Sequence, residues 1–242
     1  MIIKLSDRLQ MIADEIKKGE TMADIGTDHG FLPLYLWQNE ISPEVVMCDI
    51  SIPSLQKAID AKAQLLEDGE KLPQLLGDSI KYRAGDGLQV LSDGEVDAVV
   101  IAGMGGVLMT EIMGVNMKKT LSFKKFILQP RNHSGALRYW LTVNGFNIVS
   151  NKLVREGKFI CEIITAIPPE SEKTVKVWHA EDDAYWDMPK EMKDDELLEA
   201  FAKLKLRREM KVLAGMQRGS DVPVCEMEKI QKRAQYFAQF IK

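Results

Sequence analysis

The chain has 242 residues, 45% of them hydrophobic, and a formal net charge of −4 at pH 7. That length allows one large α/β domain, or one domain with a small appendage. The negative balance excludes a general attraction to nucleic acids, so any polyanionic partner requires a local basic patch.

The first two thirds of the chain alternate between helical and strand-like patterns. Leu5, Leu9, Ile12 and Ile16 recur at helical spacing and predict an amphipathic helix over 5–18, with Ser6 as its N-cap. Apolar runs predict strands at 21–26, 44–50, 79–87, 96–106 and 123–130. Between them, helices are predicted at 30–38 and 51–67, from the fourth run to about Met117, and at 134–144. This alternation predicts a parallel sheet covered on both faces.

Two further strand-like runs, at 145–157 and 158–167, end this part of the chain. Only a tight turn at Glu156-Gly157 joins them, and two parallel strands cannot be connected in that way. We therefore expect the Rossmann-like α/β fold of class I methyltransferases, a mostly parallel seven-stranded sheet with a C-terminal antiparallel hairpin. NAD-binding domains usually end with a sixth parallel strand instead.

The character of the sequence changes after Pro168-Pro169. Residues 170–196 are polar and acidic, with a helix-like stretch around 178–186. Beyond Leu197, two series of apolar residues recur at helical spacing on either side of a break at 215–223: Leu197, Phe201, Leu204, Leu206, Met210 and Leu213, then Met227, Ile230, Ala234, Phe237 and Ile241. They predict an antiparallel, coiled-coil-like helical arm. We expect a catalytic domain at 1–168 and an arm at 169–242, which either supports the core or grips a substrate.

The chain shows no sign of a membrane segment, a secretion signal or a metal centre. No apolar run approaches the ~18 residues of a membrane helix, and the amphipathic start lacks the apolar block of a signal peptide. The three cysteines, Cys48, Cys161 and Cys225, are scattered and fit neither a disulfide framework nor a zinc site. We expect a cytoplasmic protein without a metal or membrane partner, either a monomer or a weak homo-oligomer.

In doubly wound sheets, ligands bind beyond the carboxyl ends of the strands. Four candidate segments fall there: 24–30, 49–51, 85–87 and 102–106. The first contains Gly26-Thr27-Asp28-His29-Gly30, where Asp28 takes the place of the second glycine of the dinucleotide fingerprint. A carboxylate there repels a pyrophosphate and blocks its close approach. S-adenosylmethionine (SAM) has no phosphate and carries two cationic groups, so the sequence favours SAM.

Each segment has an expected part in holding SAM. Carboxylates would accept hydrogen bonds from the ribose and from the adenine amino group, small residues would leave room for ligands, and His29 would have a local hydrogen-bonding role. The expected cofactor residues are Asp24, Gly26, Asp28, His29 and Gly30, with Asp24 and Gly26 at the methionine end; Asp49 on the ribose, with Ile50 and Ser51; Asp86 on adenine, with Gly85 and Gly87; and Ala102, Gly103 and Met104. The alternative is that each aspartate only forms a turn or a cap.

Five motifs together resemble the bacterial tRNA (adenine-N1)-methyltransferases that modify position 22 in the D-arm. They are "LSDRLQMIADEI", "ADIGTDHGFLPLYL", "GDGL", "IAGMGG" and "ILQPRN". The resemblance implies SAM as methyl donor, a tRNA substrate and a catalytic role for Asp28. It also implies that Gln129, Pro130, Arg131 and Asn132 face the substrate, although "QPRN" replaces a Gln-Pro-Asn-like stretch, which leaves Arg131 and Asn132 as alternatives.

The reaction expected from these residues is attack by a ring nitrogen. "AGMGG" at 102–106 replaces the [DN]-P-P-[FY] sequence of exocyclic-amine methyltransferases, and adenine N1 can attack without prior deprotonation. Asp28 would orient the base or stabilise its developing charge; alternatively, it only caps the helix that starts at Gly30. The base must leave its stack, and a residue near Met104, or Tyr139 or Trp140, would stack on it.

Basic residues concentrate in the predicted arm, where Lys203, Lys205, Arg207, Arg208 and Lys211 could hold tRNA phosphates. Alternatively, they form a solvated face. Three other functions stay open: a methyltransferase acting on another substrate, a non-catalytic SAM-binding interaction protein, and an NAD-dependent enzyme.

Overall fold

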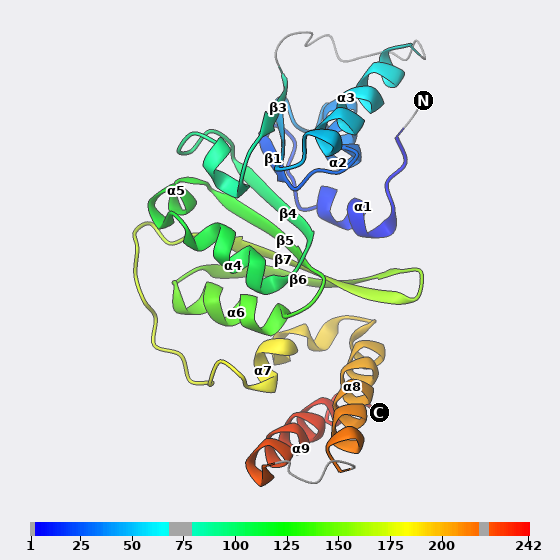
Figure 1. Ribbon diagram of the computed structural model, residues 1–242, viewed down its shortest axis with the longest axis vertical. Helices are drawn as coiled ribbons and strands as arrows, with labels where there is room; N and C mark the ends of the chain where they lie inside the picture. The colour runs from blue at the N-terminus through cyan, green and yellow to red at the C-terminus, as the bar shows by residue number, and fades with distance from the viewer. Residues whose placement is uncertain (1–2, 68–78, 218–222) are drawn as a thin grey trace.

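The computed structural model describes residues 3–67, 79–217 and 223–242 (Figure 1). These residues contain a seven-stranded sheet of order β3-β2-β1-β4-β5-β7-β6, with helices on both faces and a helical arm beyond one end. The strands are β1 Met22–Ile25, β2 Val45–Asp49, β3 Ile80–Ala84, β4 Ala98–Met104, β5 Lys125–Pro130, β6 Asn147–Glu156 and β7 Phe159–Ile167.

The pairing of the strands confirms the predicted fold class. Strands β1 to β5 pair in parallel, β7 pairs antiparallel with β5, and β6 pairs antiparallel with β7. Glu156 pairs with Phe159, so the hairpin turn is Gly157-Lys158, one residue later than predicted. Gly157 has φ +57°, a conformation that two-residue hairpin turns require and that glycine adopts without strain.

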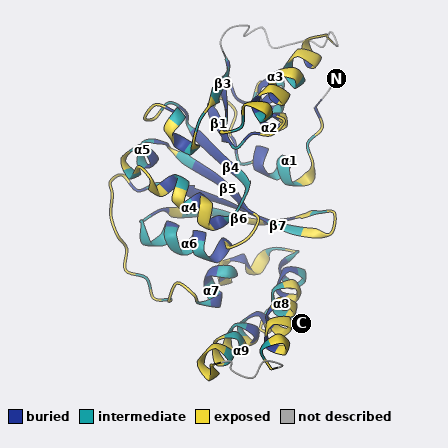
Figure 2. Ribbon diagram, in the orientation of Figure 1, coloured by how far each residue is buried: buried dark blue, intermediate teal, exposed yellow. Residues whose placement is uncertain are grey.

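The central strands are buried along most of their length (Figure 2), and their alternate residues supply two separate cores. Met22 faces one core, where it packs with α1 Asp7–Ala13, α2 Phe31–Gln38 and α3 Ile52–Glu67. Ala23 faces the other, beneath α4 Gly106–Gly114, α5 Met117–Ser122 and α6 Ser134–Val143. Because strand side chains alternate between the faces, a strand buried on both sides is apolar throughout.

Two helices differ from the prediction. Helix α1 ends at Ala13 rather than residue 18, because the chain tightens there into i→i−3 hydrogen bonds, from Glu15 N to Ile12 O (3.2 Å) and from Ile16 N to Ala13 O (3.0 Å). Ser6 is its N-cap, as predicted. Helix α5 was not predicted as a separate element; its N-cap is Asn116, whose side chain accepts from Lys119 N at 3.1 Å.

The arm consists of α7 Ala184–Asp187, a 3₁₀ turn at Lys190–Asp194, α8 Leu198–Met216 and α9 Val224–Ala238. Helices α8 and α9 pack against each other (Figure 1). The predicted apolar seam is wrong at Leu204 and Met210, which are 44% and 54% exposed. The helix-like stretch around 178–186 shortens to α7, and most of the predicted break, 218–222, lies outside the described residues.

The arm and the sheet share a small hydrophobic cluster. Leu153 of β6 and Ile160 of β7 pack with Met188, Phe201 and Phe237 of the arm. The Asp195 carboxylate also accepts a hydrogen bond from Leu153 N at 2.9 Å. The hairpin is therefore the support of the arm, while the domain division at 168/169 stays a prediction.

None of the helices in the described ranges has the length and low polarity that crossing a membrane would require.

Candidate functional site

Backbone hydrogen bonds tie together the loops that follow the first three strands. Gly26 N and Thr27 N, after β1, donate to Cys48 O in β2 at 2.8 and 3.0 Å. Gly85 N, after β3, donates to Asp49 O at 3.0 Å. Three of the four predicted segments therefore meet at one edge of the sheet.

The fourth segment is fixed to the end of β5. The register of β4 shifts between Ala102 and Met104, where Gly103 has φ +76° and donates its N–H to Gln129 Oε1 at 3.1 Å. Two backbone bonds complete the junction, from Arg131 N to Met104 O (2.7 Å) and from Gly106 N to Asn132 O (2.9 Å). This β-bulge turns the backbone away from the ladder, as bulges near functional sites do.

Asp24 is a buried carboxylate at the end of β1. Asp24 is 9% exposed, and its carboxylate accepts a 2.6 Å hydrogen bond from the Thr27 hydroxyl. Burial raises the pKa of Asp24 to about 6, the hydrogen bond from Thr27 opposes this, and the charge of Asp49 adds to the rise. The site therefore holds an acid for which a cationic ligand would be a favourable partner.

The segments after β2 and β3 present two further carboxylates. Asp49 Oδ1 accepts from Ser51 N at 2.6 Å, so Asp49 also forms a turn, and Ser51 begins the approach to α3. Ile50 between them is 75% exposed. Asp86 is exposed and precedes a 3₁₀ turn without capping it by a side-chain hydrogen bond. Asp49 therefore does form a turn, as the alternative interpretation expects, whereas the Asp86 side chain does not form a cap.

Asp28 does not cap α2. The N-cap is Gly30, with no side-chain cap bond, and the Asp28 side chain, 62% exposed, pairs with Lys57 of α3 at 2.7 Å. The hydrogen bond from Lys57 lowers the pKa of Asp28 below its usual value. His29 Nε2 lies 3.4 Å from the same carboxylate, and its ring stacks on Phe31 at 5.2 Å. Asp28 is thus an accessible anion beside the predicted cofactor loops.

Several glycines of the predicted site are required by packing. A Cβ on Gly85 would lie 2.3 Å from Val90 Cγ1, and one on Gly87 would lie 2.8 Å from Ile112 Cγ2. A Cβ on Gly26 would lie 2.1 Å from Met104 Cε, so the fourth segment covers the first.

Replacing Gly30 with alanine is expected to lower the free energy of unfolding by about 2–4 kcal/mol. Gly30 has φ +67°, and its Cβ would crowd Met47 Sδ at 2.8 Å and Ala58 Cβ at 2.9 Å. Gly103→Ala is the control, because its φ is +76° but no described atom lies within 4 Å of its Cβ. Strain alone predicts a loss of about 1–2 kcal/mol there. Urea unfolding measures both losses, and equal losses would contradict the packing role of Gly30.

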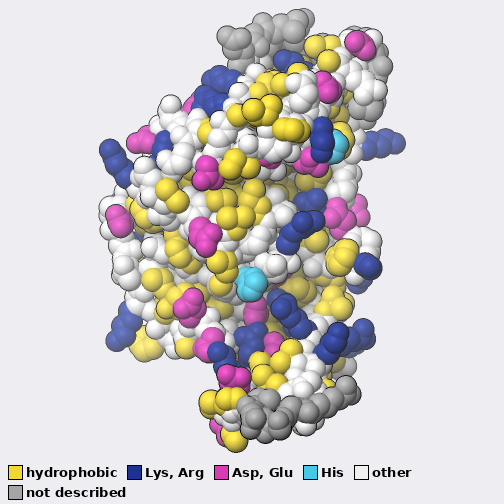
Figure 3. All heavy atoms as spheres, in the orientation of Figure 1, with side chains coloured by type: hydrophobic (Ala, Val, Ile, Leu, Met, Phe, Trp, Pro, Cys, Tyr) yellow, Lys and Arg dark blue, Asp and Glu magenta, His cyan; other side chains and the backbone are white. Residues whose placement is uncertain are grey.

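A cavity of about 830 Å³ lies beside these loops, between the end of β5, the β6–β7 hairpin and the arm. Lys and Arg side chains gather in this region of the surface (Figure 3). Residues of α1, the ends of β4 and β5, the hairpin and the arm line this cavity, among them Arg8, Gly103, Gln129, Pro130, Arg131, Asn132, Glu156, Phe159, Glu162, Asp187, Leu204, Lys205, Arg208, Glu209, Val212 and Arg233.

All four residues predicted on the substrate side after β5, Gln129 to Asn132, line this cavity. Gln129 is buried, and its Oε1 accepts from both Gly103 N and Arg8 Nη1 at 3.1 Å. Arg8 also donates to Glu156 Oε2 at 2.8 Å. Sequence reasoning missed Arg8, since only the fold brings α1 to the end of β5.

The basic residues of α8 divide between two faces. Lys205 and Arg208 line the cavity, whereas Lys203, Arg207 and Lys211 do not, and they follow one another at intervals of four along the exposed side of the helix. Lys203 pairs with Glu199 at 2.7 Å. Lys205 lies 3.5 Å from Asp187 and 3.9 Å from Glu162. The structure therefore gives Lys205 a place in an ionic network.

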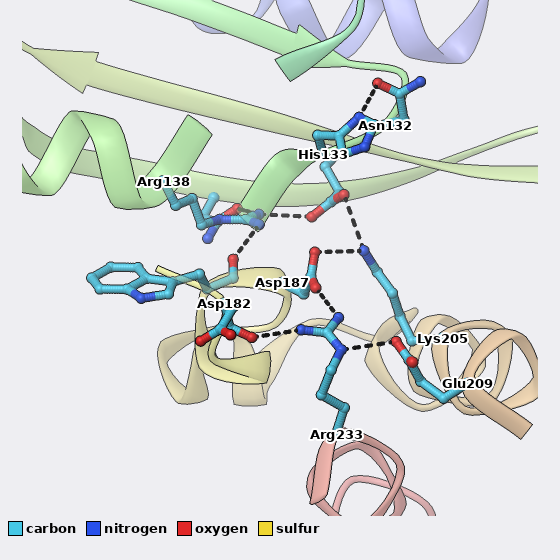
Figure 4. Close-up of polar contacts among 11 residues, drawn as sticks. Asn132, His133, Arg138, Asp182, Asp187, Lys205, Glu209 and Arg233 are labelled. Carbon is cyan, nitrogen blue, oxygen red and sulfur yellow. Dashed lines mark hydrogen bonds and ion pairs between the residues drawn. The ribbon is translucent and has the colours of Figure 1, made fainter. Parts of the chain in front are cut away.

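This network joins the arm to the sheet (Figure 4). Arg138 of α6, fully buried, donates to Glu162 of β7 at 2.8 Å and to Trp186 O at 3.0 Å. Arg233 of α9 pairs with Asp187 and, at 3.1 Å, with Glu209. Such pairs fix geometry more than they add stability, because burial of each charge is costly.

The two aromatic residues predicted to stack on a base are packed elsewhere. Tyr139 meets the Trp186 ring at 5.6 Å, and Trp140 meets Phe146 at 5.7 Å. Neither lines the cavity, whereas Phe159 of the hairpin does. Phe159 was missed because in the sequence it is only one apolar residue of a strand-like run.

No group of three or more His, Cys, Asp or Glu residues in the described ranges could hold a metal ion.

The sheet order, the terminal antiparallel hairpin and the carboxylates at the strand ends define a class I methyltransferase domain, and residues 5–164 match the family model described as a methyltransferase domain. The chain belongs to this methyltransferase-domain family, and it is similar to bacterial tRNA (adenine(22)-N(1))-methyltransferases. Its sequence is 35% identical to the Bacillus subtilis enzyme of that name over 164 residues, which span 68% of this chain and 65% of that protein.

Two solved structures extend the similarity over the arm. The crystal structure of the B. subtilis m1A22 tRNA methyltransferase TrmK has a TM-score of 0.78 at 27% identity, covering 99% of this chain and 100% of that one. Streptococcus pneumoniae Sp1610, solved in complex with S-adenosyl-L-methionine, has a TM-score of 0.78 at 22% identity, with the same coverage.

Proposed function

We propose that this protein transfers a methyl group from SAM to N1 of the adenine at position 22 in the D-arm of tRNA. The observation that carries the proposal is the meeting point at Gly103. Gly103 lies near the end of β4, at the edge of the sheet where we place the cofactor, and it also lines the cavity that reaches the arm. A substrate in that cavity would touch the loops that hold the methyl donor.

The residues at the strand ends fit SAM. Asp24 is a buried carboxylate without a cationic partner in hydrogen-bond contact among the described residues, and it suits the cationic methionine end. Asp49 would accept from the ribose hydroxyls and Asp86 from the adenine amino group. The presence of SAM in the S. pneumoniae structure supports this assignment for the shared fold.

When bound, SAM would supply an electrophilic methyl group on a sulfonium centre. Adenine N1 carries a lone pair in the ring plane, so the protein has no proton to remove before attack. Its main task is to align N1 with the methyl group, and proximity supplies most of the rate. Asp28 would accept from the adenine N6 amino group and stabilise the positive charge that develops on the ring. Arg131 and Asn132 would hold the nucleotide from the side of β5.

Incubation with labelled SAM and an unmodified tRNA transcript, followed by nucleoside analysis, tests the proposal. N1-methyladenosine is expected, and the same transcript with guanosine at position 22 is expected to stay unlabelled. Labelling of that control transcript would contradict the position, and labelled N6-methyladenosine would contradict the acceptor atom.

We also infer that the arm, residues 169–242, contributes to tRNA binding. Its removal is a poor test, since Leu153 and Ile160 of the hairpin would lose their packing partners. Substitution of single basic residues leaves this core intact and is the sharper experiment.

A further inference from the structure

The basic residues that line the cavity are not equivalent. Arg8 pairs with Glu156, Lys205 with Asp187, and Arg233 with both Asp187 and Glu209. Within the described part of the chain, the guanidinium groups of Arg131 and Arg208 have neither an ion pair nor a hydrogen bond. Arg131 follows β5 and Arg208 belongs to α8. The cavity therefore has two cations without an ion-pair partner among the described residues, one from the end of β5 and one from the arm.

The same cavity has an apolar wall that water can reach. Phe159, Leu204 and Val212 line it and are 61%, 44% and 39% exposed. Phe159 presents an aromatic ring next to the hairpin turn, with Lys158 Nζ 5.3 Å from its centroid. Scattered apolar residues on a surface are ordinary, but here three of them line one cavity together with two unpaired guanidinium groups.

Phe159 lies away from the strand ends where the methyl group would be. Leu128 of β5 pairs with Ile164 of β7, and the same register places Pro130, the last residue of β5, opposite Glu162. Phe159 therefore lies three residues, about 10 Å, beyond the strand end. A base stacked on Phe159 would be a neighbour of the acceptor adenine beside Gly103.

We propose that this cavity is a second nucleotide subsite, in which Phe159 stacks on an unpaired base near the target adenosine while Arg131 and Arg208 hold phosphates of the same strand. The proposal rests on the tRNA substrate of the proposed function. Aromatic faces and guanidinium groups are the means by which proteins bind single-stranded RNA. The subsite makes the arm and the sheet bind one RNA segment together.

Substitutions of Phe159 test the stacking contact with the full-length protein and an unmodified tRNA transcript carrying adenosine at position 22. Phe159→Ala and Phe159→Leu are expected to raise the tRNA Kd about tenfold, and Phe159→Tyr is expected to keep it within about twofold, because the aromatic face is retained. SAM affinity should not change in any variant. A Phe159→Leu variant that binds like wild type would overturn the stacking role.

Arg208 and Arg207 form a matched pair for the phosphate contact. They are neighbours on α8 with the same charge, but only Arg208 lines the cavity. Arg208→Gln is expected to weaken tRNA binding about tenfold and to reduce the slope of log K against log salt by about 0.7, the value for one phosphate on a single strand. Arg207→Gln is expected to stay within about threefold of wild type, and equal losses for both variants would refute the subsite.

These outcomes are separable from those of the proposed function. If wild-type protein forms no N1-methyladenosine and does not bind the transcript, the proposed function is wrong. If wild type methylates the transcript while Phe159→Ala and Arg208→Gln bind it normally, only the subsite is wrong.

Discussion

Replacing Asp28 with alanine is expected to lower kcat/KM for tRNA methylation about 100-fold, while the Kd for SAM changes by less than about threefold. The carboxylate is accessible and close to the cofactor loops, and the Lys57 hydrogen bond keeps its pKa low, so it is an anion at neutral pH. Steady-state kinetics with tRNA and calorimetric titration with SAM measure the two effects separately.

Two further variants separate the possible roles of this side chain. Asp28→Asn keeps an acceptor for the adenine amino group but removes the charge. An asparagine variant with most of its activity would assign Asp28 to orienting the base, and one as inactive as alanine would assign it to charge stabilisation. Lys57→Gln, a half-exposed partner on α3, is the control and should change kcat/KM only a few-fold. A parallel loss of SAM binding in Asp28→Ala would make Asp28 a cofactor-loop residue instead.

Replacing Asp24 with asparagine is expected to weaken SAM binding about 100-fold and yet to stabilise the cofactor-free protein. A pKa raised from 3.8 to about 6 corresponds to about 3 kcal/mol of folding free energy lost at neutral pH. Since asparagine needs partners of its own, a gain of about 1–3 kcal/mol is expected. A functional carboxylate held at the expense of stability is a common arrangement in binding sites.

The pH dependence of this gain has a definite sign. The folded chain keeps the Asp24 proton up to about pH 6, whereas the unfolded chain releases it near pH 3.8. As the pH rises from 3.8 to about 6, the free energy of unfolding of wild type therefore decreases relative to that of the variant, and it stays lower above pH 6. Urea unfolding should show no advantage for Asp24→Asn below about pH 4 and the full advantage above about pH 6. Asp28→Asn, whose pKa is lowered, is the control and should not be stabilised above pH 6.

The sequence determined the succession of strands and helices along the chain, and it predicted the chemistry of the cofactor edge. Continuous apolar runs at 44–50 and 96–106 predicted buried parallel strands, because only strands covered on both faces are apolar on both sides. The short connection at 156–157 predicted the antiparallel hairpin for a geometric reason. Asp28 in the first turn favoured SAM, since a carboxylate there repels a pyrophosphate, and Asp24, Asp49 and Asp86 at successive strand ends were the expected cofactor contacts. Local spacing and local charge contain all of this information.

The tertiary structure alone decided which other residues share the cavity with Gln129 to Asn132. Phe159, Arg8 and Arg208 are far apart in the sequence and share the cavity only because the hairpin, α1 and α8 converge there. A basic run on a helix predicts a concentration of charge but not which way each side chain points. Arg208 could therefore not be distinguished in the sequence from Lys205, which lies in an ionic network, or from Arg207, which lies on the outer face. Likewise, the alternative that Asp28 only caps α2 gave way to an ion pair with Lys57, 29 residues away. Ion pairs and cavities are properties of packed surfaces, which no single stretch of sequence specifies.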